Sequence, residues 1–405
     1  MAIDVRPTKD LEEFQQAFLG IGQYFGAEPN AERAERFTKN LPLERMLAAL
    51  DGGLIVGGAG SFPFELAVPG GSVSCAGVTV VGVYPTHRRR GVLRSMMRAQ
   101  LDDVRERGEP IAALWASEES IYGRYGYGMA SLNGEVALAR EHNEYAHPFL
   151  PRGQVRFLAP DEALEQLPPV WDRAFERTAG MFRRARPWWE HRIVADPAER
   201  REGGGPKRFA LLEVDGQAQG YAIYRHHFSF DEGSSTSRLV VNEAIAATPE
   251  ATAELWRFLL DIDWTATLSA DLLPIDHPLF FLLDEPRRMK FRVSDGLWVR
   301  LVDVGQALSS RSHADDGELV LDVLDSFCLW NEGRWKLAGG TCERTDDEAD
   351  LRCDVSALGS VYLGGFTFGE LARGLRVEEL RDGGLERADA IFRRQGLGPW
   401  CPEIF

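Results

Sequence analysis

One stretch of the chain, residues 78–108, constrains the fold more than any other part of the sequence. It begins with the run VTVVGVY, which is rich in β-branched residues, and passes through a turn that contains three arginines and a glycine. The apolar residues after the turn recur every three or four positions: Leu93, Met96, Met97, Leu101 and Val104. This spacing predicts an amphipathic helix that ends at Gly108. The apolar run IAALWAS then predicts a buried strand, so the order is strand, turn, helix and strand.

The turn before this helix has the features of an anion-binding site. Free backbone N–H groups and the positive end of the helix dipole meet at a helix N-terminus, and Gly91 lets a ligand approach the backbone closely. Arg88, Arg89 and Arg90 add positive charge at the same place. A basic run alone is more often a solvated face, but the strand before it and the helix after it favour an anion site. We therefore expect this turn to bind a pyrophosphate group.

Three separate motifs resemble one family of enzymes. The turn PTHRRRGVL, residues 85–93, is similar to the acyl-CoA loop of the Gcn5-related N-acetyltransferases (GNATs), although Leu93 stands where a small residue is usual. The segment ASEESIYGRYGYG, residues 116–128, and the chain end PWCPEIF resemble the Eis (enhanced intracellular survival) subfamily of these enzymes. The resemblance extends over essentially the whole chain.

The resemblance implies an acetyl-CoA site that is built from three segments. Backbone groups of Val81, Gly82 and Val83 correspond to those that pair with pantetheine in the family. Ser117 and Glu118 correspond to the family's second cofactor segment. The positions that would surround the pyrophosphate are Arg89, Arg90, Gly91, Val92, Leu93 and Arg94.

The same resemblance assigns an acid and a base for acetyl transfer. The departing CoA thiolate needs a proton, and Tyr122 aligns with the family's general acid, with Tyr125 and Tyr127 as local rivals. The family's base is the free carboxylate of a terminal phenylalanine, which is Phe405 in this chain. A terminal carboxylate has a low ordinary pKa, so it needs burial or a relaying water to accept a proton from an ammonium. The apolar residues at the chain end favour burial over a disordered tail.

Candidates for the acceptor pocket come from two regions of the chain. Pockets in this family draw on the N-terminal helices and on the chain end, which nominates Phe25, Phe37, Tyr84 and Glu403. Aromatic rings can sandwich a sugar amine, and the carboxylate of Glu403 adds negative potential for a cation. Each of these aromatic residues is more often an ordinary part of a core.

The net charge of the chain is −16, from 62 acidic and 46 basic residues. This charge argues against nucleic acid as a partner and attracts cationic small molecules, although solubility alone also explains it. Together with the resemblance, it predicts an acetyl-CoA-dependent N-acetyltransferase that acts on aminoglycosides and other polyamines, at several amines of one molecule, and on protein lysines. One alternative is a catalytically quiet protein that senses acyl-CoA or binds lipid. Another is an enzyme dedicated to protein lysines.

The length of 405 residues corresponds to about two or three domains. The resemblance implies a mixed α+β fold in which two GNAT-like domains precede a sterol-carrier-protein-like domain. Residues 1–150 are expected to form the acetyltransferase domain that holds acetyl-CoA. This domain would contain helices at residues 11–25 and 31–41, a hairpin through residues 51–53, and a closing strand within residues 131–147.

The second predicted domain, residues 151–292, repeats the strand-to-helix order of the first. Its turn reads ATPEAT, which lacks arginine and glycine, and Glu250 would repel a pyrophosphate. We therefore expect a degenerate copy without a cofactor. Residues 293–405 begin with the alternating run LWVRLVDV and resemble the last domain of Eis proteins. This domain either binds lipid or serves as a scaffold that delivers the terminal carboxylate to the first domain.

Several other classes of protein are disfavoured by the sequence. The five cysteines form no CxxC pair and the eight histidines no HExxH motif, so we expect neither a disulfide framework nor a metal site. The N-terminus is polar, and the most apolar short run, LFFLL, cannot span a bilayer. We expect a soluble cytoplasmic protein, and the resemblance implies assembly as a homohexamer.

Overall fold

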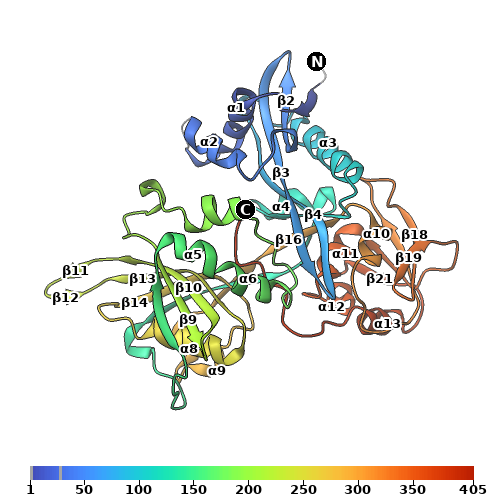
Figure 1. Ribbon diagram of the computed structural model, residues 1–405. Coiled ribbons are helices and arrows are strands. Elements are labelled where there is room, and N and C mark those ends of the chain that lie inside the picture. The colour runs from blue at the N-terminus through green and yellow to red at the C-terminus, as the bar shows by residue number, and fades with distance from the viewer. Residues whose placement is uncertain (1–2, 27–29) are drawn as a thin grey trace. The chain divides into compact units, whose positions relative to one another are not determined.

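The computed structural model describes residues 3–26 and 30–405, and its course is drawn in Figure 1. For Phe25 it describes the backbone but not the side chain. The chain divides into two units. The first unit comprises the residues up to Ser131 together with Leu297–Pro399 and Ile404–Phe405, and the second comprises Leu132–Gly296 and Trp400–Glu403.

The first unit contains a seven-stranded sheet with the order β1-β2-β3-β4-β5-β16-β6. Only β4 and β5 are parallel neighbours, and the other neighbouring pairs are antiparallel. The predicted hairpin through residues 51–53 is confirmed, since it joins β2 to β3. The strands are β1 (Asp4–Pro7), β2 (Met46–Asp51), β3 (Leu54–Val68), β4 (Gly71–Val83), β5 (Ile111–Trp115), β6 (Gly128–Met129) and β16 (Leu297–Leu301).

In the described part of the chain, four helices accompany this sheet, and one of them begins directly after the predicted anion turn. The helices are α1 (Leu11–Gly22), α2 (Ala31–Thr38), α3 (Val92–Glu106) and α4 (Glu119–Tyr122). In Figure 1, α1 and α2 lie on one side of β2 and β3, and α3 lies on the other. The predicted helices are confirmed, except that α1 passes into a short 3₁₀ turn, Gln23–Phe25, and α2 ends earlier. The predicted apolar face of α3 is also confirmed, because Met96, Met97, Leu101 and Val104 are completely buried.

A second, five-stranded sheet of the first unit comes from the C-terminal part of the chain. Its order is β19-β18-β17-β20-β21. The strands are β17 (Leu319–Leu324), β18 (Gly333–Ala338), β19 (Thr341–Arg344), β20 (Leu351–Asp354) and β21 (Val377–Glu379), and the helices are α10 (Val304–Ser309), α11 (Val355–Tyr362), α12 (Phe368–Arg373) and α13 (Gly384–Ile391). All eight residues of α11 are buried, and this helix packs against β16 and β6 of the first sheet. The two sheets therefore share one core.

A buried ion pair strengthens the connection between these two sheets. Arg300 of β16 is completely buried, and its Nη2 donates to Asp325 Oδ2 at 2.5 Å. Asp325 also accepts from the backbone N–H of Cys328 and from the side chain of Asn331. Because a buried guanidinium needs a counter-charge, the loop after β17 is held against β16.

The second unit is built on another seven-stranded sheet, with the order β15-β7-β14-β13-β10-β9-β8. β13 and β14 are parallel, and the crossover between them contains α8 (Pro249–Leu260). Figure 1 draws α8 and α9 (Leu279–Leu282) along this sheet. The strands are β7 (Leu132–Ala139), β8 (Gln154–Leu158), β9 (Arg208–Val214), β10 (Gln217–His227), β13 (Arg238–Ala246), β14 (Thr267–Leu273) and β15 (Arg292–Asp295), with a small hairpin of β11 (Phe230–Asp231) and β12 (Ser234–Ser235).

The sheets do not follow the limits at residues 150 and 292 that the sequence suggests for the domains. β7 was expected to close the first domain, but it pairs with β14 and β15 in the second sheet. β16 was expected to open the third domain, but it lies between β5 and β6 in the first sheet. The residue pattern identifies both strands correctly, whereas the partner of a strand depends on residues far away in the sequence.

Membrane-spanning helices and clusters of metal ligands are both absent from the described residues, 3–26 and 30–405. No helix in this part of the chain is long and apolar enough to cross a membrane. No group of three or more His, Cys, Asp or Glu side chains among these residues is arranged to hold a metal ion. The five cysteines are buried free thiols.

The ion pair between Arg300 and Asp325 predicts a large loss of stability when one partner is removed. Asp325→Ala leaves the guanidinium buried without its carboxylate and should lower the free energy of unfolding by about 3–5 kcal/mol. Urea titration followed by tryptophan fluorescence measures the change. Asp322→Ala is the matched control, because it removes the carboxylate that pairs with the half-exposed Arg352 in the same sheet and should cost less than about 1 kcal/mol. Equal losses in the two variants would contradict the assigned role.

Candidate active site

β4 is interrupted by a bulge shortly before the arginine turn. Its register with β3 shifts between Gly58 and Gly60, so that Val80 and Val81 together face a single residue of β3. Val80 has a φ of 48°, in the left-handed region that a β-branched residue rarely adopts. Bulges redirect the backbone of a strand and are frequent next to active sites.

β4 and β5 separate from each other before β4 reaches the turn. Their parallel pairing consists of three residue pairs and ends at Gly77 and Ala113. Beyond Gly77, the pairs that β4 makes are with β3 alone. Backbone groups on the open side can hydrogen-bond an extended ligand in the manner of an added strand. The predicted pantetheine-binding residues lie in this segment: Val81, Gly82 and Val83.

Helix α1 packs closely against the open segment of β4. A Cβ atom on Gly82 would lie 2.3 Å from the backbone nitrogen of Ile21, so this approach requires glycine. The hydroxyl of Tyr84, which follows β4, donates to the carbonyl of Gln16 in α1 at 2.9 Å. Burial raises the pKa of Tyr84. Tyr84, a predicted acceptor residue, therefore joins α1 to the end of the strand.

The predicted anion turn has an uncapped helix N-terminus. α3 begins at Val92, and Gly91 precedes it with φ 83° and ψ 0° and without a side-chain hydrogen bond to the first turn. The first backbone N–H groups of a helix have no partner within the helix and are suited to an anion. No atom lies within 4 Å of the position that a Cβ on Gly91 would take. Val92 is buried and Leu93 half-buried, so these two residues face the core while their N–H groups belong to the turn.

The basic residues around the turn have different surroundings. The arginines at positions 88–90 are all exposed. The guanidinium of Arg88 lies over the ring of Tyr24 at 4.1 Å, and that of Arg94 lies over the ring of Phe327 at 5.1 Å. Phe327 belongs to the C-terminal part of the chain, so Arg94 also contributes to the contact between α3 and that part. The combination of positive charge and free N–H groups suits a pyrophosphate.

Tyr122, the predicted acid, ends the short helix α4 that follows β5. Its side chain is buried, and burial raises its pKa to about 12, while a hydrogen bond with Ser117 opposes that shift. Glu118 is the N-terminal flanking residue of α4. The two predicted cofactor residues therefore lie directly before the helix that carries Tyr122. At neutral pH the phenol keeps its proton, as a general acid must.

The two rival tyrosines occupy different positions in the core. Tyr127 is completely buried, its hydroxyl has no hydrogen-bond partner among the described residues, and burial raises its pKa. The ring of Tyr125 packs edge-on against Phe327, with centroids 5.0 Å apart. Of the three tyrosines, Tyr122 alone has a hydrogen bond with a predicted cofactor residue, Ser117, and this bond opposes the rise of its pKa on burial. The choice of Tyr122 stays a prediction that this contact supports.

A row of phenylalanine rings connects the N-terminal helices with the chain end. Consecutive ring centroids lie 5.0, 5.4, 5.3 and 4.9 Å apart. Phe405 itself is only 8% exposed. The members of this row, in order, are Phe18, Phe37, Phe62, Phe64 and Phe405.

The aromatic row includes one residue that the sequence nominated for the acceptor pocket and three that it did not: Phe18, Phe62 and Phe64. The nominated residue is Phe37. For Phe62 and Phe64, their spacing of two residues in β3 was the available signal, because such residues lie on one face of a strand. Phe25, another predicted acceptor residue, has a side chain outside the described part of the chain. Glu403, the fourth, binds side chains of the second unit, at Arg184 and Trp188.

The corresponding turn of the second unit is capped in a different way. Thr248 precedes α8, and its side chain accepts a hydrogen bond from the N–H of Ala251 at 3.1 Å. The first residue of α8 is Pro249, which has no N–H group. Fewer donors are therefore left for an anion than at α3. The expectation that this repeat holds no cofactor stays a prediction.

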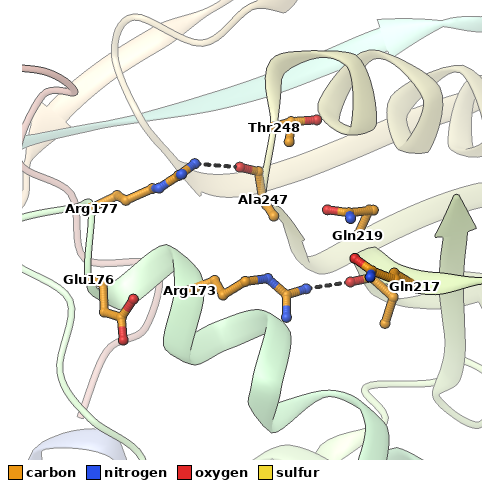
Figure 2. A pocket seen from close by; sticks show the side chains of 8 residues that line it. Arg173, Glu176, Arg177, Gln217, Gln219, Ala247 and Thr248 are labelled. Carbon is orange, nitrogen blue, oxygen red and sulfur yellow. Dashed lines mark hydrogen bonds between the residues drawn. The ribbon is translucent and has the colours of Figure 1, made fainter. Parts of the chain in front are cut away.

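A cavity of about 440 Å³ lies beside this capped turn, and Figure 2 draws the side chains that line it. Arg177 donates to the carbonyl of Ala247 at 2.9 Å, and Arg173, from α6 (Pro168–Phe175), donates to the carbonyl of Ala218. The arginines thus bind the ends of neighbouring strands. These arginines lie outside the turn before α8. At the turn before α3, in contrast, the arginines are part of the turn itself.

Comparison with protein families divides the chain into three matched regions. Residues 4–130 and residues 180–301 match two different family models that are both described as acetyltransferase (GNAT) domain. Residues 304–402 match a sterol carrier protein domain. The predicted α+β fold, with two GNAT domains before a sterol-carrier-protein-like domain, is confirmed by these matches.

Similar proteins cover nearly the whole chain. An "uncharacterized N-acetyltransferase" of Streptomyces avermitilis is 40% identical over 95% of both chains, and "N-acetyltransferase Eis" of Mycobacterium bovis is 33% identical over 95% of both. The crystal structure of Eis1 from Mycobacterium abscessus superposes with a TM-score of 0.85 at 33% identity and covers 99% of this chain and 100% of that one. A GNAT from Anabaena variabilis has the same TM-score at 20% identity, covers 100% of both chains and shows the shared fold alone.

The turn geometry predicts that Gly91 is needed for binding of acetyl-CoA. Gly91→Ala strains a left-handed backbone, costs about 1 kcal/mol and places a methyl group where the anion would approach. We expect the Kd for acetyl-CoA, measured by calorimetry, to rise about tenfold. Gly108→Ala is the matched control, because Gly108 also has a positive φ and open space but lies at the other end of α3. An equal Kd in both variants would show that the turn does not hold the cofactor.

Proposed function

Because the chain belongs to the Eis family of N-acetyltransferases, we propose that it transfers the acetyl group of acetyl-CoA to amines of cationic small molecules, aminoglycosides among them, and to protein lysines. The observation that carries this proposal is that an uncapped helix N-terminus, a buried tyrosine and a buried chain end occur together in one unit. The uncapped N-terminus follows Gly91, the tyrosine is Tyr122, and the chain end is Phe405.

The cofactor is proposed to lie along the open segment of β4. Pantetheine would continue the sheet beside residues 81–83, where β5 has separated from β4. Its pyrophosphate would accept hydrogen bonds from the first N–H groups of α3 and attract the arginines at positions 88–90. Acetyl-CoA is a co-substrate in this proposal, and no metal takes part.

The reaction follows from the proposed acid and base. The neutral amine nitrogen attacks the thioester carbon, so that a C–N bond forms and the C–S bond breaks. The carboxylate of Phe405 accepts the proton that the amine loses, directly or through a water. Tyr122 donates its proton to the departing CoA thiolate. Burial of both groups strengthens their electrostatic effect on the reacting atoms.

The proposed acceptor class follows from charge and aromatic surface. The net charge of −16 attracts polycations to the protein. The aromatic row ends at Phe405, and aromatic rings favour cations on their faces. A sugar that carries several amines could then present different amines to the same carboxylate, so modification at several sites is part of the proposal.

Other expectations from the sequence remain proposals. We propose that the protein assembles as a homohexamer and is located in the cytoplasm. The catalytically quiet alternative is not favoured, because the relatives that match over nearly the whole chain are named N-acetyltransferases. Lipid binding by the sterol-carrier-protein-like domain remains compatible with catalysis.

The proposed function is tested by release of the CoA thiol from acetyl-CoA, with the purified protein ending in native Phe405. Aminoglycosides, simple polyamines and a lysine-rich protein serve as acceptors, and mass spectrometry counts the acetyl groups added. We expect turnover with aminoglycosides and more than one acetyl group per molecule. Turnover with the protein alone would indicate a dedicated lysine acetyltransferase. Binding of acetyl-CoA without turnover of any acceptor would contradict the enzymatic proposal.

The acid assignment predicts a selective loss of turnover in Tyr122→Phe. Removal of the phenol hydroxyl should lower kcat about 10²-fold, with little change in the Kd for acetyl-CoA. Tyr125→Phe is the matched control, since it removes a hydroxyl from a buried tyrosine of the same motif. If Tyr125→Phe were the impaired variant and Tyr122→Phe turned over normally, the acid would have been assigned to the wrong tyrosine.

The raised pKa of Tyr122 predicts the shape of the pH profile. The acid must carry its proton, and with a pKa of about 12 it does so throughout the neutral and alkaline range. The acceptor amine must instead lose its proton, which favours higher pH. We therefore expect kcat to rise with pH and to show no alkaline decline up to about pH 10. A decline centred near pH 8 would mean that another group is the acid.

A further inference from the structure

Glu403, two residues before the chain end, lies in a cluster of charged and aromatic side chains of the second unit. Arg184 Nε donates to Glu403 Oε2 at 3.0 Å, and Arg184 Nη2 lies 2.7 Å from the same oxygen. The indole N–H of Trp188 contacts both carboxylate oxygens, at 3.0 and 2.9 Å. Arg192 Nε lies 3.9 Å away from Oε1. The carboxylate thus has partners on both of its oxygens.

Arg184 connects Glu403 to the sheet of the second unit. Its side chain has no exposed surface, and it also binds Glu243 of β13, at 3.1 and 2.5 Å. Glu243 in turn accepts from the hydroxyl of Tyr221 of β10 at 2.6 Å. Burial lowers the pKa of Arg184, but Glu243 and Glu403 raise it by more, so the guanidinium stays charged. The ring of Trp171 lies 3.3 Å from the guanidinium carbon and completes this enclosure.

The backbone before Glu403 is fixed in the same unit. The N–H of Trp400 donates to the carbonyl of Ala179 at 2.8 Å, and its indole N–H donates to the carbonyl of Leu272 at 2.5 Å. The thiol of Cys401 donates to the carbonyl of Glu403 at 3.3 Å. Residues 400–403 therefore belong to the second unit, whereas the last two residues of the chain belong to the first.

The charges around Glu403 argue against a direct role in binding the acceptor. Two arginines, Arg184 and Arg192, balance two carboxylates, Glu243 and Glu403. A cationic acceptor would have to compete with a completely buried guanidinium for the same oxygens. Breaking such a buried pair is strongly unfavourable, because it leaves the guanidinium without its counter-charge. The carboxylate of Glu403 therefore binds side chains of the protein rather than the acceptor.

We infer that Glu403 is a positioning residue, which holds the chain end in place so that the carboxylate of Phe405 keeps a fixed position. Two residues span at most about 7 Å, so fixing Glu403 confines the terminal carboxylate to a small volume. The burial of Phe405 against Phe64 then selects one orientation of the end. This inference rests on the proposed function only where it assigns catalysis to Phe405. The anchoring itself can be measured without turnover.

The first test measures how readily carboxypeptidase A removes Phe405 from the folded protein. The protease needs a released chain end, so the rate reports local opening of the tail. We expect Glu403→Gln to lose Phe405 about tenfold faster than the unmodified protein, after correction by synthetic peptides that end in EIF or QIF. Equal corrected rates would overturn the inference.

The matched control for this test is Asp196→Asn in the same unit. Asp196 pairs with Arg225 at 2.8 Å, and the side chains are 15% and 5% exposed, similar to 13% and 0% for Glu403 and Arg184. This variant should lose comparable stability and release Phe405 at the unmodified rate. Accelerated release in Asp196→Asn would mean that general destabilisation explains the effect. Should Glu403→Gln not fold, Glu403→Asp keeps the charge with a shorter reach and should give an intermediate rate.

The second test separates positioning from acceptor binding by kinetics. Glu403→Gln should lower kcat by about 10²-fold and leave KM for acetyl-CoA and for the acceptor within about twofold, since a displaced base slows chemistry without changing binding. In a chain that lacks Phe405, the same substitution should have no further effect. A raised acceptor KM, or an undiminished effect without Phe405, would assign Glu403 to acceptor binding and overturn the inference. If the unmodified protein acetylated no amine, the proposed function would fail while the protease result still decided the anchoring.

Discussion

The burial of the chain end is the constraint on which the proposed active site depends. Terminal residues usually fray, because few contacts offset their conformational entropy. Here Phe405 packs edge-on against Phe64 of the first unit, and Glu403 is bound by Arg184 of the second. A main-chain carboxylate can act as a base only if it has a defined place. The ring of Phe405 and the side chain of Glu403 are thus each fixed by neighbours within their own unit.

The proposed cofactor site depends on a different feature, which is that β4 and β5 stop pairing before β4 ends. The bulge at Val80 and the early end of the β4–β5 ladder leave backbone groups of β4 open, and Gly91 leaves the first turn of α3 uncapped. The C-terminal part of the chain supports this arrangement through β16, which lies between β5 and β6. Arg300 and Asp325 join that strand to the second sheet of the same unit. The sterol-carrier-protein-like domain therefore shares its core with the acetyltransferase domain.

The sequence predicts those parts that depend on local pattern. The apolar period of α3, the hairpin at residues 51–53 and the glycine turn at Gly91 are readable because a few neighbouring residues determine them. The sheet membership of β7 and β16 is not readable, because the register of a strand depends on distant partners. The identification of Tyr122 and Phe405 came from resemblance, since neither spacing nor composition marks a terminal residue as a base.

The environment of Glu403 shows a second limit of sequence reasoning. A glutamate near the chain end of an acidic protein suggests negative potential for a cation, and that interpretation needs no knowledge of its neighbours. The structure surrounds the carboxylate with Arg184 and Trp188, which lie more than two hundred positions earlier in the chain. The run RRARPWW contains both residues, but nothing in it reveals that one arginine is completely buried and needs two carboxylates. Burial of charge is a property of the fold rather than of the local sequence.

One comparison decides whether the carboxylate of Phe405 is the catalytic base. A chain extended by a single glycine after Phe405 keeps the phenylalanine ring and a free carboxylate but moves that carboxylate away from its place. We expect release of CoA thiol in the presence of an aminoglycoside to fall about 10²-fold, while acetyl-CoA binds with unchanged Kd. Turnover by the extended chain at the rate of the native chain would show that this carboxylate is not the base.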